Sequence, residues 1–147
     1  VEQARRFRPD VLQLVDRLSP QVHEELRARL PGLRLAQVVH VTGSDVTEEA
    51  IRVASGVDVL LLDSGRPDAE EKELGGTGRT HDWSVSRRIR DRVEIPVWLA
   101  GGLRPGNVAD AIRAVRPHGV DVCSGLRPEG HLDADVLARF VAAVRRA

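Results

Sequence analysis

The sequence lacks methionine and contains a single cysteine in its 147 residues. One thiol can form neither an internal disulfide framework nor a metal site that needs several cysteines. This cysteine, Cys123, lies in the apolar segment Val120–Cys123, so we expect it to pack as a small apolar side chain and not to react as a thiol. The disulfide-rich class of small proteins is therefore excluded.

An excess of charge, a long apolar run and metal-ligand spacing are also missing. The 22 basic and 22 acidic residues balance, and the basic residues are spread along helices, which gives no footprint for nucleic acid. No apolar run approaches the length of a membrane span, and no signal peptide is recognisable. The five histidines are not spaced as metal ligands. We expect a cytoplasmic protein with no nucleic-acid, membrane or metal partner and no cofactor.

Short apolar runs alternate with helical patterns along the whole chain. The runs have the length of buried strands, and they are Val11–Val15, Leu33–Val41, Val57–Leu62, Val97–Ala100 and Val120–Cys123. Helices are expected to begin at Ser19-Pro20, at Asp45 with Glu48 in capping-box spacing, and at Asp82. This strict alternation predicts a single α/β domain over residues 1–147 with a parallel sheet.

The number of these units predicts a barrel that is incomplete. Five units in 147 residues average about 29 residues each, and eight would need about 235, close to the usual size of a (β/α)8 TIM barrel. Five units cannot close that barrel. The lack of methionine and the helical pattern that begins at Val1 lead us to expect a fragment of a longer chain. The alternative is an open flavodoxin-like sheet with helices on both faces.

A carboxylate follows the most apolar of these strands directly. Asp63 comes after Leu60, Leu61 and Leu62, at the carboxyl edge where parallel sheets bind their ligands. Partial burial there raises the pKa of a carboxyl group and suits it to donate a proton, so Asp63 is the candidate general acid. A turn or helix-capping aspartate is the alternative. We expect Asp58 and Asp121, at predicted strand starts, to face solvent at the opposite end of the sheet.

Two glycine-bearing strand ends lie one unit apart near the end of the chain. Gly101 and Gly102 follow one apolar strand, and Ser124 and Gly125 follow the next. The loops after the last two strands of such barrels often present backbone N–H groups to a phosphate, helped by the N-terminus of a short helix. These four residues therefore predict a phosphate site, with ordinary turn glycines as the alternative.

The loop over residues 64–80 is far longer than the usual connection between a strand and a helix. Four of its small residues would let the backbone approach a ligand closely, and they are Gly75, Gly76, Thr77 and Gly78. Their spacing fits neither a P-loop nor a dinucleotide-binding fingerprint. We expect this loop to cover a ligand, with His81 at its end as the histidine to test. A plain flexible loop is the alternative.

At these residues the sequence resembles the phosphoribosylanthranilate isomerase family. The family's pattern has a strand ending Leu-Leu-Asp-Ser and a Gly-Gly-Thr-Gly-Lys-Thr-Phe-Asp-Trp loop. It continues with a Leu-Ala-Gly-Gly-Leu strand before an Asn-Val helix, and with a Val-Asp-Val-Ser-Ser-Gly strand. The matching segments stand in the same order, and they are Leu61–Ser64, Gly75–Trp83, Leu99–Leu103 with Asn107-Val108, and Val120–Gly125. The resemblance is strong from about Val57 onward and weaker before it.

This resemblance implies a reaction and a role for each matched residue. The reaction is the Amadori rearrangement of N-(5-phosphoribosyl)anthranilate in tryptophan biosynthesis, an aldose–ketose isomerisation by an intramolecular oxidoreductase. Asp63 matches the family's acid, and Gly101, Gly102, Ser124 and Gly125 match its phosphate-binding positions. The five strands correspond to the fourth to eighth of the barrel. The family's base cysteine and carboxylate-binding arginine, on the first two strands, therefore have no counterpart, and we expect this chain alone to be inactive.

Two other interpretations stay open. An open sheet could bind a sugar phosphate or a nucleotide without catalysing a reaction. Its unpaired edges could also pair in a homodimer or receive a missing N-terminal segment. The expected small-molecule partner of the isomerase is a sugar phosphate.

Overall fold

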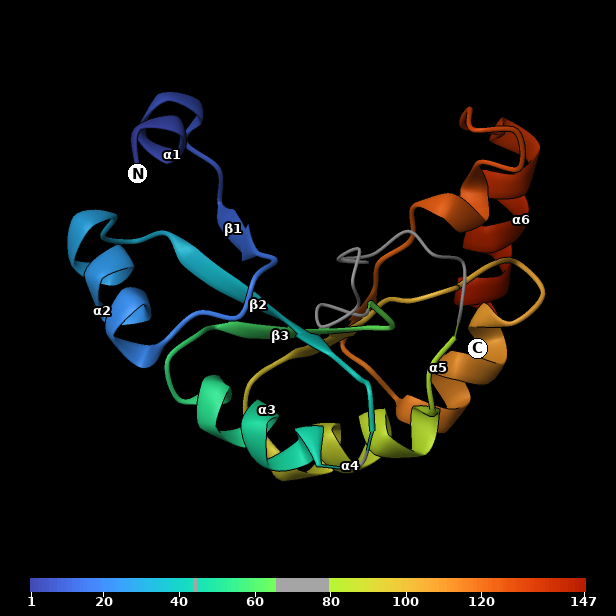
Figure 1. The fold of residues 1–147 in the computed structure, drawn as a ribbon. Helices are drawn as coiled ribbons and strands as arrows, with labels where there is room; N and C mark the ends of the chain where they lie inside the picture. Colours follow the sequence, from blue (N-terminus) through green and yellow to red (C-terminus); the bar gives the residue numbers. More distant parts are fainter. Residues whose placement is uncertain (44, 66–79) are drawn as a thin grey trace.

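The computed structural model describes residues 1–43, 45–65 and 80–147 (Figure 1). Its strands are β1 (Val11–Leu14), β2 (Arg34–His40), β3 (Val59–Asp63), β4 (Val97–Leu99) and β5 (Gly119–Val120). Its helices are α1 (Glu2–Phe7), α2 (Pro20–Arg29), α3 (Val46–Ala54), α4 (Trp83–Arg92), α5 (Val108–Val115), the short 3-10 helix η1 (Ser124–Leu126) and α6 (Ala134–Arg145). The five predicted strands are all present.

The strands lie in the sheet in the order in which they occur in the chain, β1-β2-β3-β4-β5, and every neighbouring pair is parallel. Right-handed crossovers that always advance in one direction leave their helices on one face of a sheet. Figure 1 shows this arrangement, with α2 to α6 in an arc outside a curved sheet. The fold is therefore of the (β/α) barrel type, and the flavodoxin-like alternative is wrong. The described sheet is open, with β1 and β5 at its edges.

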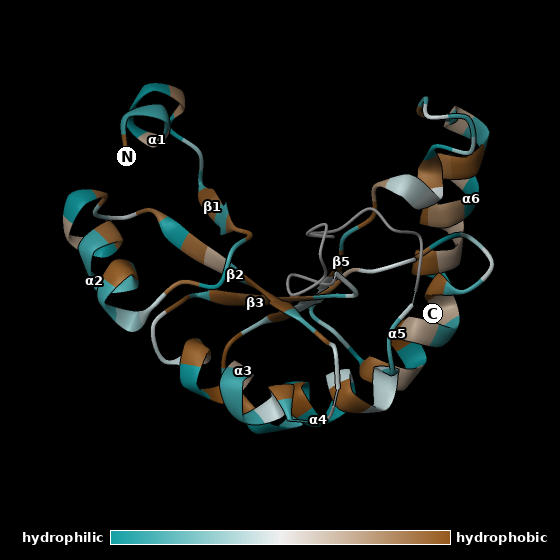
Figure 2. Cartoon of the chain, in the orientation of Figure 1, coloured by the Kyte–Doolittle hydropathy of each residue, from teal (hydrophilic) through white to brown (hydrophobic). Residues whose placement is uncertain are grey.

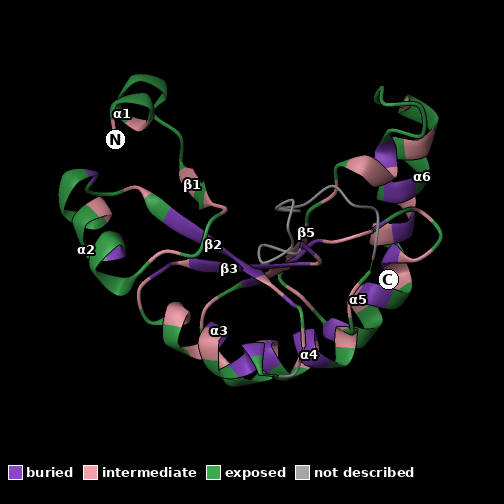
Figure 3. Ribbon diagram, viewed as in Figure 1, coloured by how far each residue is buried: buried purple, intermediate pink, exposed green. Residues whose placement is uncertain are grey.

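The two faces of the sheet are built from alternate residues of each strand. The face toward the helices carries the main hydrophobic core, and its central strand residues are Leu35, Val39, Leu60, Leu62, Val97 and Leu99. The concave face carries a smaller buried cluster of Val38, Leu61 and Ala100, packed against Trp98. Strand β3 is brown for most of its length in Figure 2 and purple in Figure 3, because it lies at the centre of the sheet. The main core thus lies between the sheet and the helices, and a smaller apolar cluster lies on the concave side.

The predicted helix starts agree with the structure, although not every predicted cap forms its hydrogen bond. Asp82 caps α4 by accepting a hydrogen bond from the N–H of Ser84 at 2.9 Å. Ser19 precedes α2, whose first residue is Pro20, and Asp45 precedes α3, but neither side chain makes a capping hydrogen bond. The cap at Asp82 fixes where the long loop re-enters regular structure.

The end of the sheet differs from the prediction in one respect that affects the site. The last strand was predicted over Val120–Cys123, but β5 ends at Val120. The chain then leaves the sheet to form η1, whose first turn is closed by the N–H of Leu126 and the carbonyl oxygen of Cys123 at 3.2 Å. Asp121 therefore stands after a strand and not near the start of one. In the described residues, no helix is both long and apolar enough to cross a membrane.

Candidate functional site

Asp63 is the last residue of β3, and its side chain lies on the concave face of the sheet. Three leucines before it are buried in the sheet, and the carbonyl oxygen of Asp63 accepts the N–H of Val41 from the neighbouring strand end at 2.8 Å. The residue is only 8% exposed, and its Oδ1 accepts the N–H of Ser64 at 2.7 Å. The strand thus holds this carboxyl group at the sheet edge with one oxygen already bonded.

Burial raises the pKa of the Asp63 carboxyl above its ordinary value of 3.8. The N–H of Ser64 and the nearby ring of His40 act in the opposite direction, and the carboxylate of Asp121 raises this pKa further. A raised pKa keeps a larger share of the carboxyl group protonated near neutral pH, which is what a proton donor needs. The electrostatics of the site are therefore those expected of a general acid.

A small cavity of about 50 Å³ brings Asp63 together with all four residues predicted to bind phosphate. Gly101 and Gly102 reach it from the loop after β4, and Ser124 and Gly125 reach it from the start of η1. In the described segments, the backbone N–H groups of these four residues donate to no hydrogen bond. They are available to an anion, and backbone N–H groups of this kind are common phosphate ligands.

Glycine is required at two of these positions by close contacts between loops. A Cβ atom on Gly125 would lie 1.8 Å from the carbonyl oxygen of Leu103. A Cβ atom on Gly101 would lie 2.7 Å from Ser64 Oγ, and its φ of +85° is one that other residues rarely adopt. The loops after β3, β4 and β5 thus pack backbone against backbone. This tight packing sets the size of the cavity.

The loop after β4 is held in place by Asn107, which precedes α5. Its side-chain Oδ1 accepts the N–H of Arg104 at 2.8 Å, and its Nδ2 donates to the carbonyl oxygen of Gly102 at 3.0 Å. Because that carbonyl is used, the N–H side of the Gly101-Gly102 turn is left for a ligand. The Asn-Val helix start noted in the sequence therefore has a direct structural role.

Asp121 is exposed as expected, but it lies at the carboxyl end of the sheet and not at the opposite end, where we expected it. It lines the same cavity as Asp63, and its N–H donates to the carbonyl oxygen of Leu99 at 2.8 Å. The prediction was wrong because β5 is shorter than its apolar run. Asp58, by contrast, lies at the opposite end as expected, where it accepts the N–H of Leu35 and pairs with Arg27.

Cys123 is exposed and lies outside β5, so the expectation that it packs within a strand was wrong. It lines the Asp63 cavity, and the guanidinium Nη1 of Arg127 lies 3.0 Å from its carbonyl oxygen and 3.4 Å from its Sγ. Its apolar neighbours in the sequence gave no sign that the chain leaves the sheet before it.

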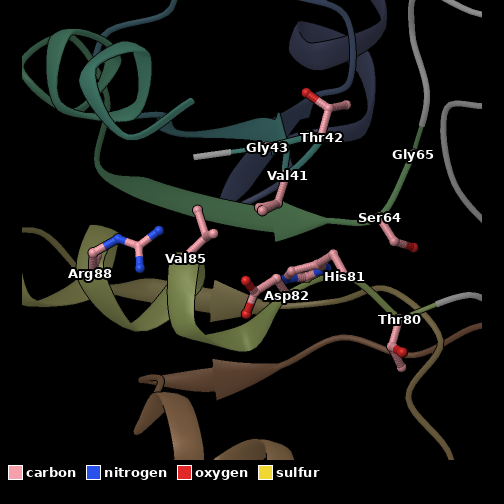
Figure 4. Close-up of a pocket in the computed structure, with 10 residues that line it drawn as sticks. All are labelled: Val41, Thr42, Gly43, Ser64, Gly65, Thr80, His81, Asp82, Val85 and Arg88. Carbon is pink, nitrogen blue, oxygen red and sulfur yellow. The ribbon is translucent and has the colours of Figure 1, made fainter. Parts of the chain in front are cut away.

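His81 lies apart from the Asp63 cavity. It lines a larger pocket of about 460 Å³ between the ends of β2 and β3 and the start of α4, which also contains Ser64, Asp82 and Arg88 (Figure 4). Its Nε2 lies 2.6 Å from Ser86 Oγ, and burial lowers the pKa of the ring to about 4. The imidazole is neutral at pH 7 and packs against α4. The predicted loop residues Gly75, Gly76, Thr77 and Gly78 lie outside the described residues.

A further polar residue at the strand ends was missed in the sequence. His40 ends β2 and is the register partner of Asp63. A single histidine is more often a packing residue than a ligand, as His23 of α2 illustrates: its Nε2 lies 2.9 Å from Gln37 Oε1. The signal that could have identified His40 is its position at the end of β2, which is the position that Asp63 has in β3. Among the described residues, no group of three histidine, cysteine or acidic side chains is placed to hold a metal ion.

Comparison with known proteins gives a consistent result. The model of the N-(5'-phosphoribosyl)anthranilate (PRA) isomerase family matches residues 1–143. The N-(5'-phosphoribosyl)anthranilate isomerase of Methanocella arvoryzae is 40% identical over 146 residues, which are 99% of this chain and 66% of that relative. The chain thus spans about two thirds of the length of this curated relative.

Solved structures agree with the sequence match. The phosphoribosyl anthranilate isomerase of Thermotoga maritima is similar with a TM-score of 0.81 and 29% identity, over 99% of this chain and 66% of that one. A second isomerase structure, in complex with reduced 1-(o-carboxyphenylamino)-1-deoxyribulose 5-phosphate, gives a TM-score of 0.77 and 26% identity, over 99% and 64% of the two chains.

Proposed function

The chain belongs to the N-(5'-phosphoribosyl)anthranilate isomerase family, and from this we propose that its protein converts N-(5'-phosphoribosyl)anthranilate into the carboxyphenylamino-deoxyribulose phosphate in tryptophan biosynthesis. The observation that carries this proposal is the single cavity shared by Asp63 and the four unbonded backbone N–H groups of the β4 and β5 loops. A proton donor and an anion site side by side suit a phosphorylated sugar as substrate.

The proposed role of Asp63 is that of general acid. Its proton goes to the ring oxygen of the ribose while the bond between C1' and that oxygen breaks, and the nitrogen lone pair forms the C1' iminium. Loss of the C2' proton to a base then gives an enol-amine, which becomes the ketone. Burial at the strand end supports this role, since a carboxyl group with a raised pKa keeps its proton to a higher pH.

The phosphate is proposed to bind at Gly101, Gly102, Ser124 and Gly125. The close contacts that forbid a Cβ atom at Gly101 and Gly125 leave the backbone itself as the binding surface. Binding the phosphate there would place the sugar against Asp63, which lines the same cavity. The bound sugar phosphate analogue in one related structure fits the same chemical class of ligand.

The base is proposed to come from outside the 147 residues. None of the described residues that line the cavity matches the base in the family's pattern. The described sheet also has unpaired edges at β1 and β5. We propose that the 147-residue chain alone binds phosphate but does not turn over substrate. Activity would require a piece with the first three βα units of the family's barrel, seated on those edges.

An NMR titration of the 147-residue chain tests the anion site. Inorganic phosphate should shift the amide signals of Gly101, Gly102, Ser124 and Gly125 together, with one dissociation constant. Ribose without phosphate should leave them in place. Shifts confined to exposed arginines on the helices, such as Arg87 and Arg88, would indicate nonspecific binding and would overturn the assignment of the site.

A further inference from the structure

His40 is the described polar side chain that is hardest to explain by packing alone. Both of its ring nitrogens are buried, and neither has a hydrogen-bond partner. A buried polar group without a partner costs about 1–3 kcal/mol, so most such groups are paired. His23 shows the ordinary solution in this chain, since its buried ring bonds to Gln37 on the helix side of the sheet. An unpaired imidazole at a strand end therefore calls for a role.

The position of His40 relates it directly to the proposed acid. His40 and Asp63 are register partners on neighbouring parallel strands, so their side chains leave the sheet on the same face. The N–H of Val41 and the carbonyl oxygen of Asp63, 2.8 Å apart, tie the two strand ends together immediately beyond this pair. Ser64 bonds to Oδ1 of Asp63, and no described group bonds to Oδ2. An imidazole and a carboxyl group with an unbonded oxygen thus sit side by side.

The neighbouring elements add further side chains to the concave face. Gln13 on β1 is the register partner of Ala36, four residues before His40, and Trp98 on β4 packs against Val38, Leu61 and Ala100. The loop after β5 contributes Asp121, whose charge acts on Asp63 in the direction opposite to that of His40. Cys123 and Arg127 lie beyond it, in contact with each other. The carboxyl group of Asp63 is therefore placed between one imidazole and one carboxylate.

We infer that His40 is a positioning residue for the acid: its imidazole lies beside the Asp63 carboxyl group on the concave face and is coupled to it, while Asp121 faces that group from the loop after β5. This inference rests on the proposed function for its meaning in catalysis, but the coupling itself belongs to the folded chain. A protonated His40 favours the Asp63 carboxylate, and a neutral His40 favours the acid form.

Carbon-detected NMR titration of the 147-residue chain tests this coupling without an activity assay. The side-chain carboxyl signal of Asp63, assigned with the Asp63→Asn variant, should titrate at higher pH by roughly half a pH unit or more in His40→Gln. In Asp121→Asn it should titrate at lower pH.

The matched control is His118→Gln, which removes an exposed histidine at the opposite end of the sheet, next to β5. It should leave the titration of Asp63 unchanged, and amide spectra should confirm that each variant is folded. If His40→Gln moves Asp63 no more than His118→Gln does, the inference is overturned. A failure of the proposed isomerase activity would leave this coupling intact, so the two failures can be told apart.

Discussion

Gly125 and Leu103 approach each other so closely that a Cβ atom on the glycine would lie 1.8 Å from the leucine carbonyl oxygen. This contact joins the loop after β4 to the start of η1, which are the two segments that carry the proposed phosphate ligands. Side chains can turn away from a clash, but a backbone carbonyl can move only with its loop. The contact therefore couples the stability of the fold to the shape of the site.

Gly125→Ala should destabilise the chain by about 2 kcal/mol or more, because the new methyl group forces the two loops apart. Denaturant unfolding measures this effect. Gly106→Ala is the matched control: a Cβ atom there meets nothing within 4 Å, so its effect should be about 1 kcal/mol or less. Equal stabilities for the two variants would contradict the close contact.

Asp63→Asn should make the chain more stable at neutral pH. The folded-state pKa of Asp63 is raised above 3.8, so folding disfavours its charged form, and this cost is present above the folded-state pKa and absent below 3.8. The gain in melting temperature over wild type should therefore disappear in acid. Asp58→Asn should act in the opposite direction, because it weakens the pair with Arg27. A less stable Asp63→Asn variant at pH 7 would contradict the cost of folding with a charged Asp63 carboxylate.

His81 should make the chain sensitive to mild acid. Its pKa falls from 6.5 to about 4 on folding, so between these values the unfolded chain binds a proton that the folded chain refuses. Stability contributed by the neutral ring is thus complete above pH 6.5 and is lost as the pH falls toward 4, by up to about 3 kcal/mol.

The variant His81→Gln, which can still bond to Ser86, should show less loss of stability over this pH range than the wild type does. Urea unfolding at a series of pH values measures the difference. His131→Gln, which replaces an exposed histidine, should follow the wild-type curve. If all three curves run in parallel, the ring of His81 is not the group responsible.

Complementation should show the catalytic role of Asp63. When the 147-residue chain is mixed with a piece that carries the first three βα units of the family's barrel, isomerase activity should appear, and Asp63→Asn should lower kcat by a factor on the order of 100 or more. Phosphate binding should persist in this variant. Near wild-type turnover would remove Asp63 from the mechanism, and full activity of the 147-residue chain alone would show that it holds its own base.

Local sequence was a sufficient guide where a residue's neighbours determine its place. Leu60 to Leu62 predicted both a buried strand and the position of Asp63, and Asp82 predicted the start of α4. It failed where tertiary contacts decide the outcome. No residue near Asp121 or Cys123 marks the end of β5 in the sequence. The strand ends after Val120 because its neighbour β4 is short and ends at Leu99. The pairing of His40 with Asp63 likewise depends on register between strands 23 residues apart, which no local pattern reports.

The division of the sheet into a helix-facing side and a concave side has an evolutionary consequence. Residues such as Leu62 and Leu99 hold the helices to the sheet, whereas their neighbours Asp63 and Ala100 face the cavity. Mutations at cavity-facing positions can therefore alter the chemistry while the main core stays the same. One scaffold can in this way be adapted to new substrates through few substitutions, each at an alternate position at or just beyond the end of a strand.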